Sequence, residues 1–200
     1  REAGQRDRLL VGRDEEIGLL RRAWQQSKSG HGQVVLVNGE PGIGKSALVD
    51  TLLAQLRDEG VPRITIRCSH YHTNTALYPV IEHVKKVIGW QAEDVPNLNL
   101  DRLEHRLKGD RMPLEELVPP LASLLSLPLP EGRYPPLNLS AQDLKQRILD
   151  DLAEWQFEIA QRQPTVMVWE DLHWADPSSL EYLSLLIEQV PTASLLLVLT

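Results

Sequence analysis

The feature that most constrains the fold is a glycine-rich segment between an apolar run and a run with helical spacing. Residues 34–49 read Val-Val-Leu-Val-Asn-Gly-Glu-Pro-Gly-Ile-Gly-Lys-Ser-Ala-Leu-Val. They fit the pattern G-x-x-x-x-G-K-[ST], whose fixed positions are filled by Gly39, Gly44, Lys45 and Ser46. The apolar run before the loop is typical of a buried parallel strand. The residues after it predict a helix, because apolar side chains recur at Leu48, Val49, Leu52, Leu53 and Leu56.

This unit predicts a site for a phosphate chain. Glycines let the backbone come close to an anion and adopt positive φ angles. A helix that starts near Lys45 directs its free N–H groups and positive dipole end at that anion. Lys45 can reach the β- and γ-phosphates, and the Ser46 hydroxyl can ligate Mg²⁺. The alternative, a glycine-rich turn without a ligand, is disfavoured by the complete motif. The predicted contacts to ATP or ADP are Gly39, Glu40, Pro41, Gly42, Ile43, Gly44, Lys45, Ser46 and Ala47.

A second acidic centre follows a later strand, predicted over Thr165–Trp169. Glu170 and Asp171 come directly after it. In a parallel sheet the end of this strand aims carboxylates at the space beside the phosphates, where oxygen ligands suit Mg²⁺. We therefore predict Ser46, Glu170 and Asp171 as metal ligands, and Lys45, Glu170 and Asp171 as the catalytic set. An acidic pair in a solvated loop is the alternative.

The order of the two acids bears on rate. Motor ATPases usually carry Asp and then Glu, where the Glu polarises water. Here Asp171 occupies the second position and is one methylene shorter. Because misplacing a catalytic group by about 1 Å can cost about a hundredfold in rate, we expect slow turnover. Slow turnover suits a switch better than a motor.

Composition narrows the class of protein. The net charge of −7 gives no electrostatic footprint for nucleic acid, although another segment of a longer protein could still contact DNA. One cysteine permits no internal disulfide and indicates a reducing compartment. The apolar run Leu195–Leu199 is far too short to span a membrane, and no signal peptide opens the chain. From these observations we expect a cytoplasmic protein. We also expect a fragment of a longer protein, because the chain starts without Met and ends inside an apolar run.

The remaining pattern alternates strands with helices, which predicts a mainly parallel sheet covered on both faces. An irregular helical insertion is expected at about 90–140. Pro119 and Pro120 are expected to break or kink a helix in it, and residues 127–139 to form an extended linker. Expected helix N-caps are Asp14, Ser140 and Asp176. The other expected elements are a strand at 63–68, a helix at 77–88, a helix from 177 to about 190 and a strand at 194–199.

Four segments together resemble a known family. They are Leu10-Val11-Gly12-Arg13, Gly39 to Ser46, Tyr71-His72-Thr73-Asn74 with Leu77-Tyr78-Pro79, and Glu170-Asp171-Leu172-His173-Trp174-Ala175-Asp176. In this order they resemble the AAA-type ATPase module of the STAND class of signalling ATPases. The likeness is strongest to the module in multidomain bacterial class III adenylate cyclases, and large helix-turn-helix regulators carry a similar one. It covers nearly all 200 residues.

The resemblance implies an α/β P-loop NTPase of the ASCE/AAA type, with strand order 5-1-4-3-2. It places Val11, Gly12 and Arg13 on the adenine side and makes Thr200 a sensor residue that faces the γ-phosphate. The domain would span 1–200 and be incomplete, with strand 5, a sensing arginine and a helical domain beyond Thr200. Strand 34–37 would then be an apolar sheet edge prone to self-pairing.

The predicted function is an ATP-binding, slowly hydrolysing regulatory switch within a larger signalling protein. Its partners would be nucleotide and other domains of the same polypeptide, such as a cyclase or DNA-binding output, with neither a membrane nor direct nucleic-acid contact. Three alternatives stay open: a DNA-acting AAA-type motor or loader, a small-molecule kinase, and a domain that binds nucleotide without hydrolysis. His173 and Trp174 are expected to pack under the site. His70, His72 and His83 lack the ligand spacing of a zinc site.

Overall fold

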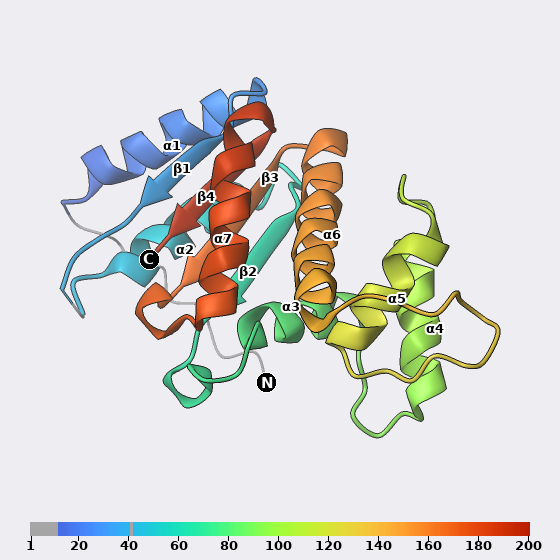
Figure 1. Cartoon of the computed structure of the whole chain (residues 1–200). Helices are drawn as coiled ribbons and strands as arrows, with labels where there is room; N and C mark the ends of the chain where they lie inside the picture. Colours follow the sequence, from blue (N-terminus) through green and yellow to red (C-terminus); the bar gives the residue numbers. More distant parts are fainter. Residues whose placement is uncertain (1–11, 41) are drawn as a thin grey trace.

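The computed structural model describes residues 12–40 and 42–200. A parallel sheet forms its centre, with the strands in the order β1-β4-β3-β2 (Figure 1). The strands are β1 (Gln33–Leu36), β2 (Arg63–Arg67), β3 (Thr165–Glu170) and β4 (Leu195–Leu199). Every residue of β3 and β4 is buried, as their apolar sequences predict for strands covered on both faces. The α/β class and the parallel sheet are thus confirmed, whereas strand 5 stays a prediction.

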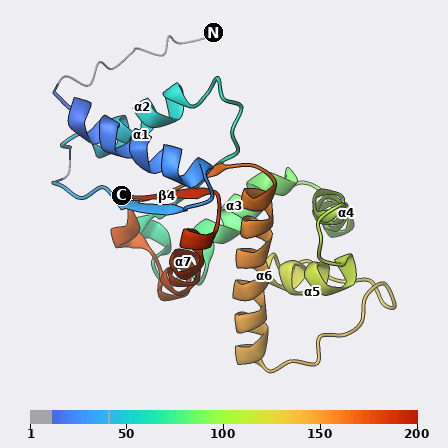
Figure 2. The ribbon, with the colours of Figure 1, turned by 90° about the horizontal axis from the view of Figure 1, so that it is seen from above.

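Helices cover both faces of the sheet. Figure 2 shows α1 (Asp14–Lys28) and α2 (Lys45–Gln55) on one side, and α3 (Tyr78–Ile88), α6 (Ala141–Arg162) and α7 (Pro177–Gln189) on the other. Side chains of β3 alternate between two cores, because successive residues of a strand point to opposite faces. Val166 and Val168 pack with α1 and α2, while Met167 and Trp169 pack in the core that includes α3, α6 and α7.

The region expected as a helical insertion carries α4 (Pro96–Leu107) and α5 (Leu114–Leu124), which lie on the far side of α6 from the sheet (Figures 1 and 2). Of the break or kink expected at Pro119 and Pro120, the break is wrong, because α5 continues through both prolines. Both prolines are buried, so their rings add apolar surface to this core. Residues 127–139 contain no helix or strand, as expected for a linker.

The structure confirms two of the three predicted helix N-caps. Ser140 Oγ accepts a hydrogen bond from Asp143 N at 3.1 Å, and Asp176 Oδ1 accepts one from Ser179 N at 3.0 Å. Both are therefore N-caps, as predicted. The prediction for Asp14 is wrong, since Arg13 is the N-cap residue and Asp14 opens the first turn of α1. There the carboxylate still lies near the positive end of the helix dipole.

Within residues 12–40 and 42–200, no helix combines the length and the apolarity that crossing a membrane requires.

Candidate functional site

The four parallel strands end at one edge of the sheet, where the predicted site residues gather. In open α/β sheets this edge is where ligands bind. Hydrogen bonds tie the neighbouring ends together: Val37 N donates to Leu199 O at 2.8 Å, and Thr200 N donates to Trp169 O at 2.9 Å. Leu172 N donates in turn to Thr200 O at 2.9 Å. Thr200 therefore lies between the glycine-rich loop that follows β1 and the acidic residues that end β3.

The glycine-rich loop has the backbone conformation that its sequence predicts. Gly42 and Gly44 have φ angles of +83° and +99°, which favour glycine. Gly44 is the N-cap residue of α2, and no side-chain hydrogen bond caps that helix. The first N–H groups of α2 can thus bind an anion. Pro41 lies outside the described residues.

Lys45, the first residue of α2, folds back over this loop. Its Nζ donates to Gly39 O at 2.8 Å and to Glu40 O at 3.2 Å. The ammonium group is therefore held at the loop backbone, where it adds a full positive charge to the helix dipole. Ser46 is exposed in the first turn of α2, so its hydroxyl is accessible, and Ala47 next to it is half-buried.

The two predicted acids differ in their surroundings. Glu170 continues the alternation of Val166 and Val168, which places its side chain on the α2 face of the sheet. It is 9% exposed, and its Oε2 accepts a hydrogen bond from Arg67 Nε at 2.6 Å. Asp171 is exposed and has a φ of +59°, a left-handed conformation that Asp tolerates better than most residues. The chain therefore turns at Asp171 and leaves its carboxylate in solvent.

The structure contradicts the expected packing of His173 and Trp174. Both residues belong to the short 3₁₀ helix η2 (Leu172–Trp174), and both are exposed, Trp174 at 41%. The Trp174 ring centre lies 5.5 Å from that of His70, which opens η1 (His70–His72). The two rings therefore form part of an aromatic surface outside the site and do not support it from below.

Asp176 has a second role that the sequence does not reveal. Its Oδ1 accepts hydrogen bonds from Ser179 N and from Leu77 N, each at 3.0 Å, and the residue is only 1% exposed. Leu77 has a φ of +56° and precedes α3. One buried carboxylate therefore fixes the starts of both α7 and α3.

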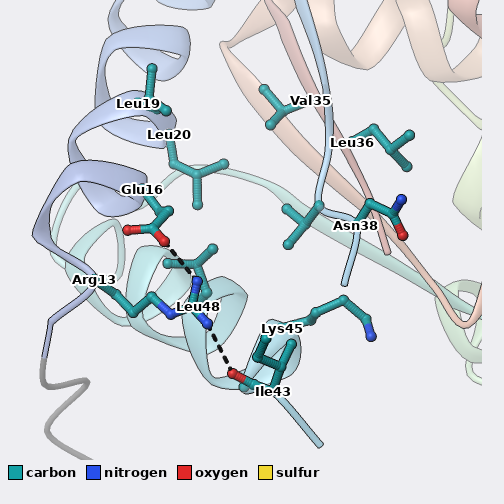
Figure 3. A pocket seen from close by; sticks show the side chains of 12 residues that line it. Arg13, Glu16, Leu19, Leu20, Val35, Leu36, Asn38, Ile43, Lys45 and Leu48 are labelled. Atoms are coloured by element: carbon teal, nitrogen blue, oxygen red, sulfur yellow. Dashed lines mark hydrogen bonds and ion pairs between the residues drawn. The ribbon is translucent and has the colours of Figure 1, made fainter. Parts of the chain in front are cut away.

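A pocket of about 240 Å³ adjoins the phosphate loop, between α1 and β1 (Figure 3). Arg13 bridges its walls, since Nη1 donates to Glu16 Oε1 at 2.6 Å and Nη2 donates to Ile43 O at 3.3 Å. The hydrogen bond from Arg13 lowers the pKa of the Glu16 carboxyl. The full lining is Arg13, Glu16, Leu19, Leu20, Val35, Leu36, Val37, Asn38, Ile43, Gly44, Lys45 and Leu48.

Four of the predicted nucleotide contacts, Arg13, Ile43, Gly44 and Lys45, line this pocket, whereas its α1 wall was not predicted. The sequence feature that could have indicated this wall is Leu19, an apolar residue on the polar side of α1. In the structure its side chain is 57% exposed. Gly12 is exposed with a φ of +78° and does not line the pocket, while Val11 lies outside the described residues.

The donors at this edge fit Mg²⁺ better than zinc. A hydroxyl at Ser46 and a carboxylate at Glu170 are oxygen ligands, and Mg²⁺ usually combines one or two carboxylates with phosphate oxygens and water. In the described part of the chain, no three His, Cys, Asp or Glu side chains gather as a metal-binding group. A metal here would therefore depend on the nucleotide for several of its ligands.

The fold and the glycine-rich loop define an α/β domain of the phosphate-loop class. Residues 9–199 match the AAA ATPase domain family. The chain belongs to this family, whose domains bind nucleotide. The predicted AAA-type module is thereby confirmed.

The chain is also similar to part of a much longer protein. An uncharacterised protein of Rhizobium meliloti (strain 1021) is 24% identical to it over 175 residues. The aligned region covers 87% of this chain and 16% of that relative. The chain thus spans about one sixth of the length of the relative that it matches.

Proposed function

We propose that this chain is a nucleotide-dependent switch domain that binds ATP or ADP with Mg²⁺ at the sheet edge described above. The observation that carries the proposal is the glycine loop itself: positive φ angles at Gly42 and Gly44, an uncapped helix start and the Lys45 ammonium lie within one short segment. Together they favour a chain of phosphates and few other ligands.

The pocket beside the loop would take the base of the nucleotide. It combines apolar walls, such as Leu20 and Val35, with the polar side chains of Arg13 and Glu16. Most small-molecule sites share this mixture of apolar surface and a few placed polar groups. Since Gly44 and Lys45 also line the pocket, a base bound there would be continuous with phosphates on the loop.

Glu170 and Asp171 would have different roles in hydrolysis. In this proposal Glu170 and Ser46 would hold Mg²⁺, which would neutralise charge on the phosphates. Lys45 stabilises the charge that develops on the γ-phosphate, and Asp171 accepts a hydrogen bond from the attacking water and orients it. Thr200 lies at the centre of the edge, where its hydroxyl could report whether a γ-phosphate is present.

Turnover would be slow. Asp171 is shorter than the Glu of motor ATPases, and its left-handed backbone turns it into solvent. A water held by such a residue is less well oriented, and poor orientation reduces rate steeply. Slow hydrolysis gives the bound state a long lifetime, which a regulatory switch requires.

The domain would act within a larger signalling protein of the STAND class. The 16% coverage of the Rhizobium meliloti relative supports a module in a long polypeptide. The output, whether a cyclase or a DNA-binding domain, would then be carried by other parts of that polypeptide.

Calorimetric titration of the full protein with ADP and ATP in the presence of Mg²⁺ tests this proposal. Lys45→Ala should weaken binding at least tenfold, because one charge-assisted hydrogen bond contributes about 1.5–3 kcal/mol. Lys108→Ala, which removes an exposed lysine after α4, is the matched control and should bind like the parent. Equal affinities in the parent and the Lys45 variant would refute the site.

A further inference from the structure

Arg67 makes a contact to the site that the proposed mechanism does not use. It is the last residue of β2 and lies opposite Glu170, the last residue of β3, in the parallel register. Arg67 Nε and Nη2 both lie 2.6 Å from Glu170 Oε2. Two donors of one guanidinium thus converge on a single oxygen of the carboxylate proposed to hold the metal.

The contact lies on the face of the sheet that the phosphate-loop helix covers. Along β2, Ile64 and Ile66 point into the core formed with α3, and Arg67 therefore points to the opposite face. That is the face of α2, where Glu170 also lies. The guanidinium and the proposed metal position would consequently share one carboxylate from the same side of the sheet.

We infer that Arg67 is a positioning residue that competes with the divalent cation for the Glu170 carboxylate. The inference rests on the proposed function and deepens it. Arg67 would set how much Mg²⁺ strengthens nucleotide binding. With the arginine present, the carboxylate charge is already partly neutralised, so it attracts the metal less strongly. Without the arginine, the metal becomes the cation on which this carboxylate depends.

The exposure of the two side chains supports competition over permanent pairing. The Glu170 side chain is 12% exposed, whereas the Arg67 side chain is 71% exposed. A mostly buried carboxylate requires a cation or hydrogen-bond donors nearby. The Arg67 guanidinium is itself mostly in solvent, so it loses little when it moves away, provided that another cation takes its place beside the buried carboxylate. Mg²⁺ next to Glu170 would also repel the arginine, so both cannot hold the same oxygen equally well.

A purely structural role predicts something different. A cross-strand ion pair that only joins β2 to β3 would lower stability when removed and leave the metal dependence of nucleotide binding unchanged. The backbone already joins these strand ends, since Cys68 N donates to Glu170 O at 3.0 Å. The two readings can therefore be separated by a binding measurement that does not depend on turnover.

The experiment measures ADP affinity by calorimetry twice for each full-chain variant, once with excess Mg²⁺ and once with a chelator. The ratio of the two affinities is the metal-dependent gain. In Arg67→Gln this gain should be about fivefold larger than in the parent, the factor expected for one exposed ion pair at the upper end of its range. Arg63→Gln is the control, because Arg63 lies on the same strand and the same face.

Glu170→Gln completes the test. In that background the metal-dependent gain should be small and should not change on adding Arg67→Gln, because the shared carboxylate is gone. An unchanged or smaller gain in Arg67→Gln alone would overturn the inference while nucleotide binding remained. Absence of ADP binding in the parent would overturn the proposed function, and this inference with it.

Discussion

Asp176 offers the sharpest test of how the site is held in place. Asp176→Ala removes the acceptor of Leu77 N and Ser179 N, and also the partner of Ser179 Oγ at 2.5 Å. Losing an N-cap costs about 1 kcal/mol, and each buried donor left without a partner costs about 1–3 kcal/mol. Because Ser179 N makes the N-cap bond of α7 and Leu77 N is the additional buried donor at the start of α3, we expect a loss of about 2–4 kcal/mol in the free energy of unfolding.

Two further variants make the measurement specific. Ser140→Ala removes an exposed N-cap that holds only its own helix, so it should cost about 1 kcal/mol. Asp176→Asn keeps one oxygen as acceptor for both backbone donors and should cost less than Asp176→Ala. Urea unfolding at pH 7 gives all three values. If Asp176→Ala costs no more than Ser140→Ala, the bond to Leu77 contributes nothing and the reasoning is refuted.

Two other predictions concern stability. Burial, with smaller contributions from Lys86 and Arg106, lowers the pKa of His83 to about 4 from an ordinary 6.5, so the unfolded chain binds a proton that the folded chain does not. Stability should therefore fall by up to about 3 kcal/mol between pH 6.5 and pH 4, and His83→Gln should remove that part of the pH dependence in urea unfolding. Ser126 follows α5 with a φ of +55°, where Leu127 N donates to Ala122 O at 2.8 Å. Ser126→Gly should raise the melting temperature by relieving about 0.5–1 kcal/mol of backbone strain, and a lower one would contradict this.

Features encoded by neighbouring residues were predictable. The loop motif, the N-caps at Ser140 and Asp176, and the apolar strands β3 and β4 each depend on a few consecutive positions. Contacts between distant segments were not. Arg67 reaches Glu170 across 103 positions and Leu77 reaches Asp176 across 99, and no periodicity relates such pairs.

The helix α5 shows why a local rule can fail. Each internal proline removes one backbone hydrogen bond and crowds the preceding turn, which predicts a break. Pro119 and Pro120 are nonetheless buried, and α5 packs against both α4 and α6. Tertiary packing therefore outweighs the local cost, and the sequence of α5 alone does not contain that information.

The contacts between distant residues hold both ends of the segment between β2 and α3. Its first end is bonded to β3 by Arg67 and by Cys68 N, both on Glu170, and its second end is bonded to Asp176 by Leu77 N. Burial, with Asp176 and Asp171 nearby, raises the pKa of the Cys68 thiol to about 11, so that thiol stays protonated and unreactive at neutral pH. Both ends of the segment are thus bonded to residues of one short stretch, Glu170 and Asp176. A metal that displaced Arg67 from the Glu170 side chain would therefore leave the segment held at both ends by backbone donors, Cys68 N on Glu170 O and Leu77 N on Asp176 Oδ1.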